Sequence, residues 1–314
     1  MNQIYQIVKE KIKNHDYFFI SINTIREHGF HILNILSNYQ LERNAFYKKT
    51  GYRLNLKNPI TFNEKIIWKK IYDRNPLLPI TADKHQVRFY IKEMLGEEKA
   101  NEILIPHFYV TDRPETIPFN KLPPDFIVKP NHASGLKIIV KNGQFNQSDI
   151  IKNCQRWLKT RYGLSKLEWA YQPIKRKIII EKLLLDKNGN TAKEYFFHMF
   201  NGKCKLIRII LKKTDNPIII SFDENWNLLY DDMSVCTEKS KIKKPKSYEN
   251  MLKIANIIAK PFDYIRVDLY DLNGKIHIGE LTHYHASGRE KFKSKTFDEK
   301  LGNYWKIQPN YWKM

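Results

Sequence analysis

Residues 264–288 read YIRVDLYDLNGKIHIGELTHYHASG and contain the pattern that decides the fold. β-Branched and aromatic residues on both sides of Asn273-Gly274 predict two antiparallel strands joined by a tight turn. Three ionisable residues stand where a core hairpin normally carries apolar or neutral side chains: Arg266, Asp268 and Glu280. Their placement indicates that one face of the hairpin serves chemistry while the other packs the core.

The length of the turn decides whether the two acids share a face. Side chains alternate along a strand, so Arg266 and Asp268 lie on one face and the intervening apolar residues on the other. A two-residue Asn273-Gly274 loop would place Asp268 and Glu280 on opposite faces, whereas a three-residue loop with a bulge at Gly274 would place them on the same face. We favour the three-residue loop because it gathers both carboxylates around Arg266.

Two carboxylates held close together repel each other unless a cation lies between them. Arg266 could partly serve as that cation in a buried ion network without further function. The alternative is a magnesium site, because Mg²⁺ prefers hard oxygen ligands and shares them with phosphate groups. Arg266 would then stabilise negative charge on a phosphoryl group during its transfer.

An upstream segment, DFIVKPNHASGLKIIV at residues 125–140, has the composition of a phosphate-binding flap. Lys129 ends a predicted strand, and the small residues of loop 131–135 let backbone N–H groups approach phosphate oxygens. No helix follows, which distinguishes the segment from a Walker loop. His132 could donate to a phosphate. A surface hairpin with an incidental lysine is the alternative interpretation.

The segment KIIIEKLLL at residues 177–185 predicts a strand that ends in an acid and runs into an apolar stretch. Such a stretch could form a slot for an adenine base. Backbone groups around Leu183 and Leu184 would read the base, and the acid would bind ribose hydroxyls.

The composition of the 314 residues fits a folded chain, with 42% hydrophobic and 13% aromatic residues. The net charge of +21 invites a nucleic-acid interpretation, but the lysines are spread from end to end, which favours an anionic small substrate or a membrane surface. Cys154, Cys204 and Cys236 are too few and too far apart for a disulfide framework or a zinc site. No signal peptide or apolar run of membrane-spanning length occurs, so we expect a cytoplasmic protein that its charge could hold at the inner face of a membrane.

The remaining pattern predicts an α+β fold with a mostly antiparallel second half. Helical spacing fills residues 1–50 and ends at Gly51, and Thr61 with Glu64 predicts a capping box. A further helix should begin at Thr81 or Asp83 and end at Gly96. The other expected elements are a helix capped by Ser148, a hairpin turned at Asn201-Gly202, the short strands 217–223 and 227–232, and an amphipathic helix over 247–262.

In chain order these segments resemble the ATP-grasp superfamily, and more closely its TupA-like branch, named for teichuronopeptide synthesis and found in bacterial surface-polysaccharide gene clusters. The resemblance runs from about Pro59 to Gly302 and rests on five motifs: TFNEKIIWKKIYDRNP, ADKHQVR, KPNHASG, EYFFHMFNGK and RVDLY…GELTHYHASG. It implies two α+β lobes that grip ATP, with a helical N-terminal extension. The implied segments are 1–58 for the extension, 59–122 for N-terminal lobe elements, 123–186 for the small lobe with the flap, and 187–314 for the C-terminal lobe with the metal site.

The resemblance also implies roles for individual residues. Lys129 would contact the α- and β-phosphates, Arg266 would meet the γ-phosphate, and these two would be the catalytic residues. Asp268 and Glu280 would bind Mg²⁺. The remaining cofactor-binding positions would be Lys84 or Arg88 as a second cation, His132, Ser134 and Gly135 in the flap, and Glu181, Lys182 and Leu184 at the ribose and adenine.

In such enzymes ATP phosphorylates a carboxylate, and an amine then attacks the acyl phosphate to give an amide. For this chain the resemblance implies a carboxylate–amine ligase that joins an amino acid or amine to a uronic-acid-type sugar in capsule, O-antigen or teichuronic-type polysaccharide synthesis. Its partners would be the nucleotide and an anionic or lipid-linked saccharide. The alternatives are a glycosyltransferase or sugar kinase on the same fold, and a non-catalytic basic protein that binds polysaccharide or nucleic acid.

Two positions depart from the family pattern. Thr282 stands where many ATP-grasp enzymes have a metal-binding asparagine, and Glu194-Tyr195-Phe196 replaces the usual Asp-Tyr-Lys of the branch. If the second strand continues past Thr282, His283 and His285 share a face; a zinc site involving them and His277 is a further alternative. We expect an acceptor pocket just beyond the metal strand, formed by Thr282, His283, Tyr284, His285, Ser287 and Arg289.

Overall fold

The computed structural model describes residues 16–212, 218–230 and 242–311, and the protein divides into two compact units. Unit 1 consists of Met1–Glu42 and His107–Lys182, and unit 2 consists of Arg43–Pro106 and Leu183–Met314. In this division the first helical residues are grouped with the flap segment, and the four segments expected from the sequence stay a prediction. One boundary falls between Lys182 and Leu183, inside the predicted adenine segment.

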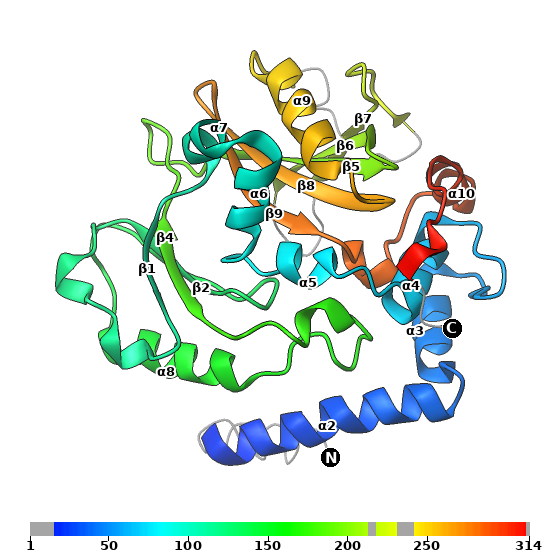
Figure 1. Cartoon of the computed structure of the whole chain (residues 1–314), viewed down its shortest axis with the longest axis horizontal. Coiled ribbons are helices and arrows are strands. Elements are labelled where there is room, and N and C mark those ends of the chain that lie inside the picture. Colours follow the sequence, from blue (N-terminus) through cyan, green and yellow to red (C-terminus); the bar gives the residue numbers. More distant parts are fainter. Residues whose placement is uncertain (1–15, 213–217, 231–241, 312–314) are drawn as a thin grey trace. The chain divides into compact units, whose positions relative to one another are not determined.

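Unit 1 is built on a four-stranded antiparallel sheet with the strand order β1-β4-β2-β3 (Figure 1). The strands are β1 (His107–Thr111), β2 (Phe126–Pro130), β3 (Ile138–Val140) and β4 (Ile178–Lys182). Helix α8 (Gln147–Lys159) supplies Ile150, Cys154 and Trp157 to the core on one side of the sheet. Helix α2 (Asp16–Leu36) contacts α8, and the 3₁₀ turns are η1 (Pro114–Thr116), η2 (Phe119–Lys121) and η3 (Trp169–Tyr171).

Alternation of side chains gives the sheet of unit 1 two different faces. Phe126 and Val128 of β2 and Ile178 and Ile180 of β4 are fully buried in the core that α8 completes. The residues between them therefore point to the other face.

Unit 2 contains a five-stranded antiparallel sheet in the order β7-β6-β5-β8-β9 (Figure 1). Its strands are β5 (Lys193–Phe200), β6 (Lys203–Lys212), β7 (Ile218–Phe222), β8 (Tyr264–Leu272) and β9 (Lys275–Thr282). Its helices are α4 (Phe62–Tyr72), α5 (Leu77–Ala82), α6 (Val87–Leu95), α7 (Glu97–Ile103), α9 (Tyr248–Ala259) and α10 (Lys295–Tyr304), with η6 (His285–Gly288) and η7 (Pro309–Tyr311); α3 (Gln40–Thr50) begins at the boundary.

The two faces of the larger sheet differ in chemistry. Helix α9 packs over β5, β6 and β8, where Phe197 stacks on Tyr248 and Val267 is fully buried. On the other face, Phe62 of α4 lies against Phe200 and Tyr264, and these rings close one end of the face. The rest of that face carries the ionisable residues of β8 and β9.

Several local expectations are confirmed. Thr61 and Glu64 form the capping box of α4, Gly51 and Gly96 adopt left-handed backbone angles at helix ends, and Asn201-Gly202 turns the β5–β6 hairpin. Cys154 and Cys204 are buried free thiols, whereas Cys236 lies outside the described residues.

Other local expectations are wrong. The cap of α8 is Asn146, whose side chain accepts from the backbone of Ser148 and Asp149. Thr81 lies at the end of α5 instead of starting a helix. The expected N-terminal helix is broken where Asn38 and Tyr39 take left-handed angles, between α2 and α3. Within the described part of segment 227–232, Leu228 forms only an isolated bridge.

Candidate functional site

The β8–β9 hairpin brings Asp268 and Glu280 to the same face of the sheet, but the irregularity that does so is not the expected three-residue loop. Leu272 pairs with Lys275, so the turn is the two-residue loop Asn273-Gly274, with φ angles of 56° and 85°. The three-residue loop is therefore wrong. Further along, Asp268 pairs with Glu280 while Leu269 pairs with Ile278, so one extra residue is inserted into β9. This bulge returns the second acid to the face of the first.

The extra residue is Gly279, and the space beside it admits no side chain. A Cβ atom there would lie 2.7 Å from Cε2 of Tyr270 and 3.4 Å from the carbonyl oxygen of Asp268. Glycine inside a strand often marks a bulge or a close approach, and this was the signal in the sequence that could have located the bulge.

Arg266 is the centre of the ionisable face in unit 2. Its Nε and Nη2 atoms donate to the two oxygens of Asp268 at 2.6 and 2.5 Å, which is a bidentate ion pair. Nη2 also donates to Oγ1 of Thr282 at 3.1 Å and lies 3.5 Å from Oε1 of Glu280. The guanidinium lies 4.7 Å from the ring centre of Phe196. The aromatic ring therefore supports the arginine by a cation–π contact.

The two acids have different surroundings. Asp268 is fully buried, and burial raises its pKa, although the bidentate contact with Arg266 opposes the shift and favours the carboxylate. Burial alone would lower the pKa of Arg266, but Asp268 and Glu280 outweigh it and raise that pKa above the ordinary value. The side chain of Glu280 is 27% exposed and receives Nζ of Lys84 at 3.3 Å. The face thus holds a fixed buried carboxylate beside a more accessible one.

His285 connects Arg266 to a second ion pair that the sequence did not reveal. Nη1 of Arg266 lies 2.9 Å from Nδ1 of His285, and since a guanidinium can only donate, Nδ1 accepts. Burial lowers the pKa of His285 to about 4, so the neutral ring carries its proton on Nε2, which lies 3.4 Å from Oε2 of Glu290. Arg208 completes the chain with Nη1 3.3 Å from Oε1 of Glu290.

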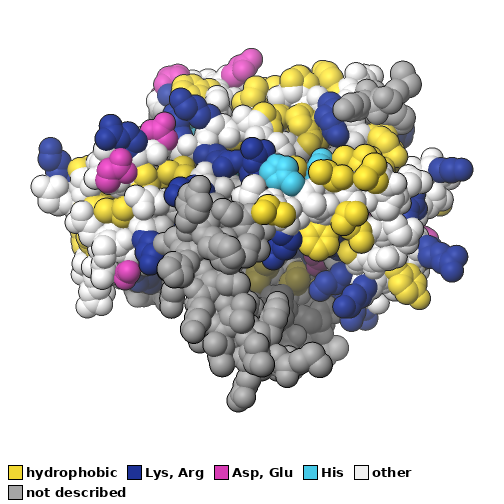
Figure 2. Space-filling view, turned by 90° about the horizontal axis from the view of Figure 1, so that it is seen from below, with side chains coloured by type: hydrophobic (Ala, Val, Ile, Leu, Met, Phe, Trp, Pro, Cys, Tyr) yellow, Lys and Arg dark blue, Asp and Glu magenta, His cyan; other side chains and the backbone are white. Residues whose placement is uncertain are grey.

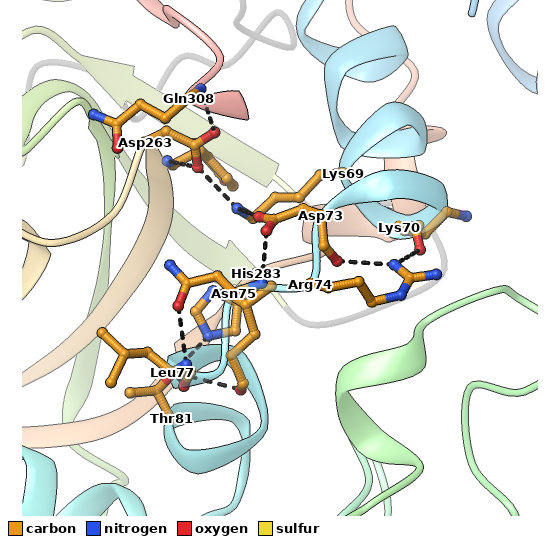
Figure 3. Close-up of polar contacts among 12 residues, drawn as sticks. Lys69, Lys70, Asp73, Arg74, Asn75, Leu77, Thr81, Asp263, His283 and Gln308 are labelled. Carbon is orange, nitrogen blue, oxygen red and sulfur yellow. Dashed lines mark hydrogen bonds and ion pairs between the residues drawn. The ribbon is translucent and has the colours of Figure 1, made fainter. Parts of the chain in front are cut away.

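His283, one of the other expected acceptor residues, is separated from His285. Strand β9 ends at Thr282, and Ala286 and Ser287 take left-handed angles, so His283 and His285 do not share a strand face as expected. Nε2 of His283 lies 2.7 Å from Oγ1 of Thr81 within a buried cluster (Figure 3), and burial lowers its pKa well below the ordinary value.

The segment after β9 is anchored to α4. Lys70 donates to Oγ of Ser287 at 3.1 Å and to its carbonyl oxygen. Tyr284 is buried and Arg289 is half-buried. Of the two cations expected from the early helix, the structure brings only Lys84 to the acids, because Arg88 donates to the carbonyl oxygen of Ile105 at 2.8 Å.

In unit 1, Lys129 and Glu181 meet on the sheet face opposite the one that α8 covers. Nζ of Lys129 lies 2.6 Å from Oε1 of Glu181, and Nε2 of His107 lies 3.7 Å from the other carboxylate oxygen. The lysine is therefore held by the acid that was expected at the ribose. His107, which pairs with Glu181 across β1 and β4, was missed because it stands in a short strand without a motif.

The loop after Lys129 is fixed at its base and open at its tip. The Asn131 side chain accepts from the backbone of Lys177 and donates to the carbonyl oxygen of Lys175. His132 is buried beside it, whereas Ser134 and Gly135 are exposed and Gly135 has a φ of +79°. An exposed glycine-containing tip can bring backbone N–H groups to an anion, as a flap requires.

The adenine segment straddles the boundary between the units along the chain. Lys182 is the exposed last residue of β4, and Leu184 is buried as part of unit 2. The carbonyl oxygen of Leu184 accepts from the backbone of Ala192 at 3.2 Å.

The donor set of unit 2 fits Mg²⁺ with its bound phosphates. Asp268 and Glu280 supply hard carboxylate oxygens, and Thr282 donates to Glu280 at 3.3 Å. In the described ranges no group of three or more His, Cys, Asp or Glu residues could hold a metal. A site with two carboxylates suits Mg²⁺, which usually completes its shell with water and phosphate oxygens. Separately, none of the helices described is long and apolar enough to cross a membrane.

The protein has an ATP-grasp fold, and each of its two units is built on an antiparallel sheet. The chain belongs to the TupA-like ATP-grasp family, whose model matches residues 64–306. No curated protein sequence matches the chain.

Among solved structures, the chain is similar to D-alanine–D-alanine ligase from Bacillus anthracis, with 20% identity over 65% of this chain and 57% of that one, at a TM-score of 0.41. It is also similar to D-alanine–D-alanine ligase from Helicobacter pylori, with 13% identity over 80% and 69% of the chains and a TM-score of 0.43. The ATP-grasp ligase PsnB, complexed with a minimal precursor, Mg and ADP, gives 13% identity over 77% and 66% at a TM-score of 0.37. The chain thus spans little more than half of the Bacillus anthracis ligase.

Proposed function

We propose that this protein is an ATP- and Mg²⁺-dependent ligase that joins a carboxylate to an amine through an acyl phosphate. The observation that carries the proposal is the arrangement around Arg266, whose guanidinium is fixed by Asp268 and lies 3.5 Å from Glu280 on one sheet face. A fixed guanidinium beside two hard-oxygen acids suits phosphoryl transfer, because catalysis there consists mainly of positioning and charge stabilisation.

In this proposal Asp268 and Glu280 hold Mg²⁺, which when bound would neutralise charge on the nucleotide phosphates. Arg266 stabilises the transferred γ-phosphoryl group, and His285 keeps the guanidinium in place from the other side. In unit 1, Lys129 contacts the α- and β-phosphates, and the backbone of Ser134 and Gly135 forms the flap. The nucleoside is assigned to Glu181, Lys182 and Leu184.

The chemistry balances in two steps. A carboxylate oxygen of the substrate attacks the γ-phosphorus of ATP, and the bond to ADP breaks. The amine nitrogen then attacks the carbonyl carbon, phosphate leaves, and the nitrogen loses one proton. We assign the acceptor to the region of Thr282, His285, Ser287 and Arg289, and we omit His283 because it is bonded to Thr81.

The proposed substrate is an anionic saccharide of the uronic-acid type, free or lipid-linked, used in bacterial surface-polysaccharide synthesis in the cytoplasm. The net charge of +21 supports an anionic acceptor, and the family supports the class of reaction.

Trapping with hydroxylamine tests the reaction class. The protein is incubated with ATP, Mg²⁺, glucuronate and hydroxylamine, and the products are identified by mass spectrometry. A ligase of this kind yields a hydroxamate together with ADP and phosphate, in amounts that rise with enzyme concentration. ADP formation with a phosphorylated sugar hydroxyl and no hydroxamate would instead identify a sugar kinase. Because the acceptor is unidentified, a panel of uronic acids replaces glucuronate if the first probe gives no product.

A further inference from the structure

Helix α2 exposes apolar side chains on one side. Ile25, Ile32 and Leu36 are 72%, 53% and 79% exposed, and their spacing of seven and four residues places them along one line of the helix. The neighbouring exposed apolar residues are Phe30, Leu33 and Ile35. We call these six side chains the α2 face.

The inward side of the same helix is polar. Oε2 of Glu27 accepts from the backbone N–H of Ser165 at 3.0 Å. Asn34 is buried, and its Oδ1 accepts from the backbone of Glu42 at 2.9 Å. The helix therefore has the reverse of the usual surface pattern, in which the apolar side faces the core. Contiguous exposed apolar surface of this kind marks an interaction site.

A basic pocket lies directly beside this helix in unit 1. It has a volume of about 370 Å³, and residues of α2, α8 and the following loop line it. Five of its lining residues are cationic and one is acidic: Arg26, Arg156, Lys159, Arg161, Lys166 and Glu27. Oε1 of Glu27 lies 3.6 Å from Arg26, while its other oxygen receives Ser165. The described lining thus carries four more cationic than acidic side chains, five against one.

We propose that the α2 face and the basic pocket together form a docking surface for an anionic lipid bilayer. The apolar side chains would enter the boundary between headgroups and acyl chains, and the pocket would receive a phosphate headgroup. Figure 2 views the side on which α2 lies and shows hydrophobic side chains next to Lys and Arg side chains.

Charge favours a bilayer over a second copy of this chain as the occupant. A two-fold dimer through the α2 face would bring two basic pockets near each other, whereas a bilayer containing anionic lipid complements them. The proposal does not depend on the proposed ligase activity, and its test uses no nucleotide.

Co-sedimentation with vesicles tests the surface in the full-length protein. Vesicles of phosphatidylcholine alone are compared with vesicles of phosphatidylcholine and phosphatidylglycerol in equal parts. We expect binding to the vesicles that contain phosphatidylglycerol, at least ~10-fold stronger than to phosphatidylcholine alone and weakened by salt. Failure of the unmodified protein to sediment with the anionic vesicles would overturn the proposal.

Matched variants separate the surface from general charge and hydrophobicity. Ile32→Asp with Leu36→Asp removes the apolar contact, and its control is Phe89→Asp, at a residue 63% exposed on α6 of unit 2. Each variant is first shown to keep the thermal unfolding transition of the unmodified protein. We expect the α2 variant to lose vesicle binding and the control to keep it.

The pocket is tested by Arg161→Glu with Lys166→Glu. The control is Lys253→Glu with Lys300→Glu, which changes the net charge by the same amount on exposed positions of α9 and α10. If both double variants lose vesicle binding equally, net charge alone is responsible for binding. That result would contradict the proposed docking surface. A dimer that the α2 variant dissociates, without vesicle binding by the unmodified protein, would assign the face to a second copy instead.

Discussion

The ring of Tyr270 occupies the space where a side chain at position 279 would have to be. A Cβ atom on Gly279 would lie 2.7 Å from Cε2 of that ring, closer than real Cβ contacts allow. The ring and the glycine together fix the bulge that turns Glu280 toward Asp268.

Gly279→Ala should therefore damage the site more than the fold. We expect a loss of about 1–3 kcal/mol in the free energy of unfolding, because the added methyl group must displace Tyr270. The Mg²⁺-dependent rise in unfolding temperature with ATP should also shrink. The loss should be smaller in a Tyr270→Ala background, measured as a double-mutant cycle by denaturant unfolding. Gly29→Ala is the control, since nothing lies within 4 Å of its Cβ position.

Asp268→Asn should abolish the effect of Mg²⁺ on nucleotide binding. The amide keeps the shape of the side chain but removes the negative charge that would hold the metal, and it leaves Arg266 with a weaker partner. We expect about 1–3 kcal/mol of lost stability. Thermal unfolding with ATP, in the presence and absence of Mg²⁺, measures the effect. Asp271→Asn, three residues along β8, is the control and should keep the Mg²⁺-dependent shift.

Lys129→Met should weaken nucleotide binding without removing its dependence on Mg²⁺. The variant keeps the aliphatic part of the side chain but removes the ion pair with Glu181, whose other carboxylate oxygen lies 3.7 Å from Nε2 of His107. We expect affinity for ATP to fall by roughly 10–100-fold, which corresponds to one lost charge-assisted contact. Titration calorimetry measures it, with Lys152→Met on α8 as the control. Unchanged affinity in Lys129→Met would remove this lysine from the proposed phosphate contacts.

Glu290 should make the protein sensitive to acid. Burial alone would raise the pKa of Glu290, but its contacts with His285 and Arg208 lower it to about 2, against an ordinary value of 4.5. The unfolded chain therefore takes up the proton first as the pH falls. The stabilisation is complete above pH 4.5 and is lost toward pH 2, by at most about 3 kcal/mol.

Denaturant unfolding at a series of pH values measures this loss. Glu290→Gln should lower stability at neutral pH and flatten the dependence below pH 4.5. Glu299→Gln, which removes a more exposed acid paired with Lys295, should leave the slope unchanged. If Glu290→Gln and the unmodified protein show the same slope, the ion pair with Arg208 does not contribute to stability in this range.

Local signals in the sequence were sufficient for much of the fold. The capping box of α4 and the Asn-Gly turns depend on residues within a few positions of each other. They can therefore be predicted from short stretches of sequence. The shared face of Asp268 and Glu280 was also predictable, because that arrangement gathers both carboxylates around Arg266.

The position of the bulge was not predictable from alternation alone. A bulge at Gly274 and one at Gly279 put the acids on the same face, and only the packing of Tyr270 distinguishes them. Asn146 and Ser148 are two residues apart, and both residue types are good helix caps. The sequence alone therefore does not predict which of them caps α8.

The contacts of His285 could not be predicted from the sequence for a different reason. They depend on the chain leaving the strand at Thr282 and on the left-handed residues Ala286 and Ser287. Glu290 and Arg208 are brought to the histidine by tertiary structure, and neither stands in a motif that the sequence marks.

The buried ion pair between Lys69 and Asp263 has a consequence for the order in which the chain folds. Nζ of Lys69 lies 2.8 Å from Oδ1 of Asp263, across 194 positions of sequence, and 2.5 Å from Asp73 (Figure 3). The ribosome therefore releases α4 long before Asp263, the residue just ahead of β8 that pairs with the buried lysine, has been synthesised. Residues 107–182 of unit 1 emerge in between and can collapse on their own sheet. The buried ion pair of unit 2 therefore cannot be complete before residue 263 has been synthesised, and a chain stopped before Asp263 would leave Lys69 with Asp73 as its remaining partner of the two.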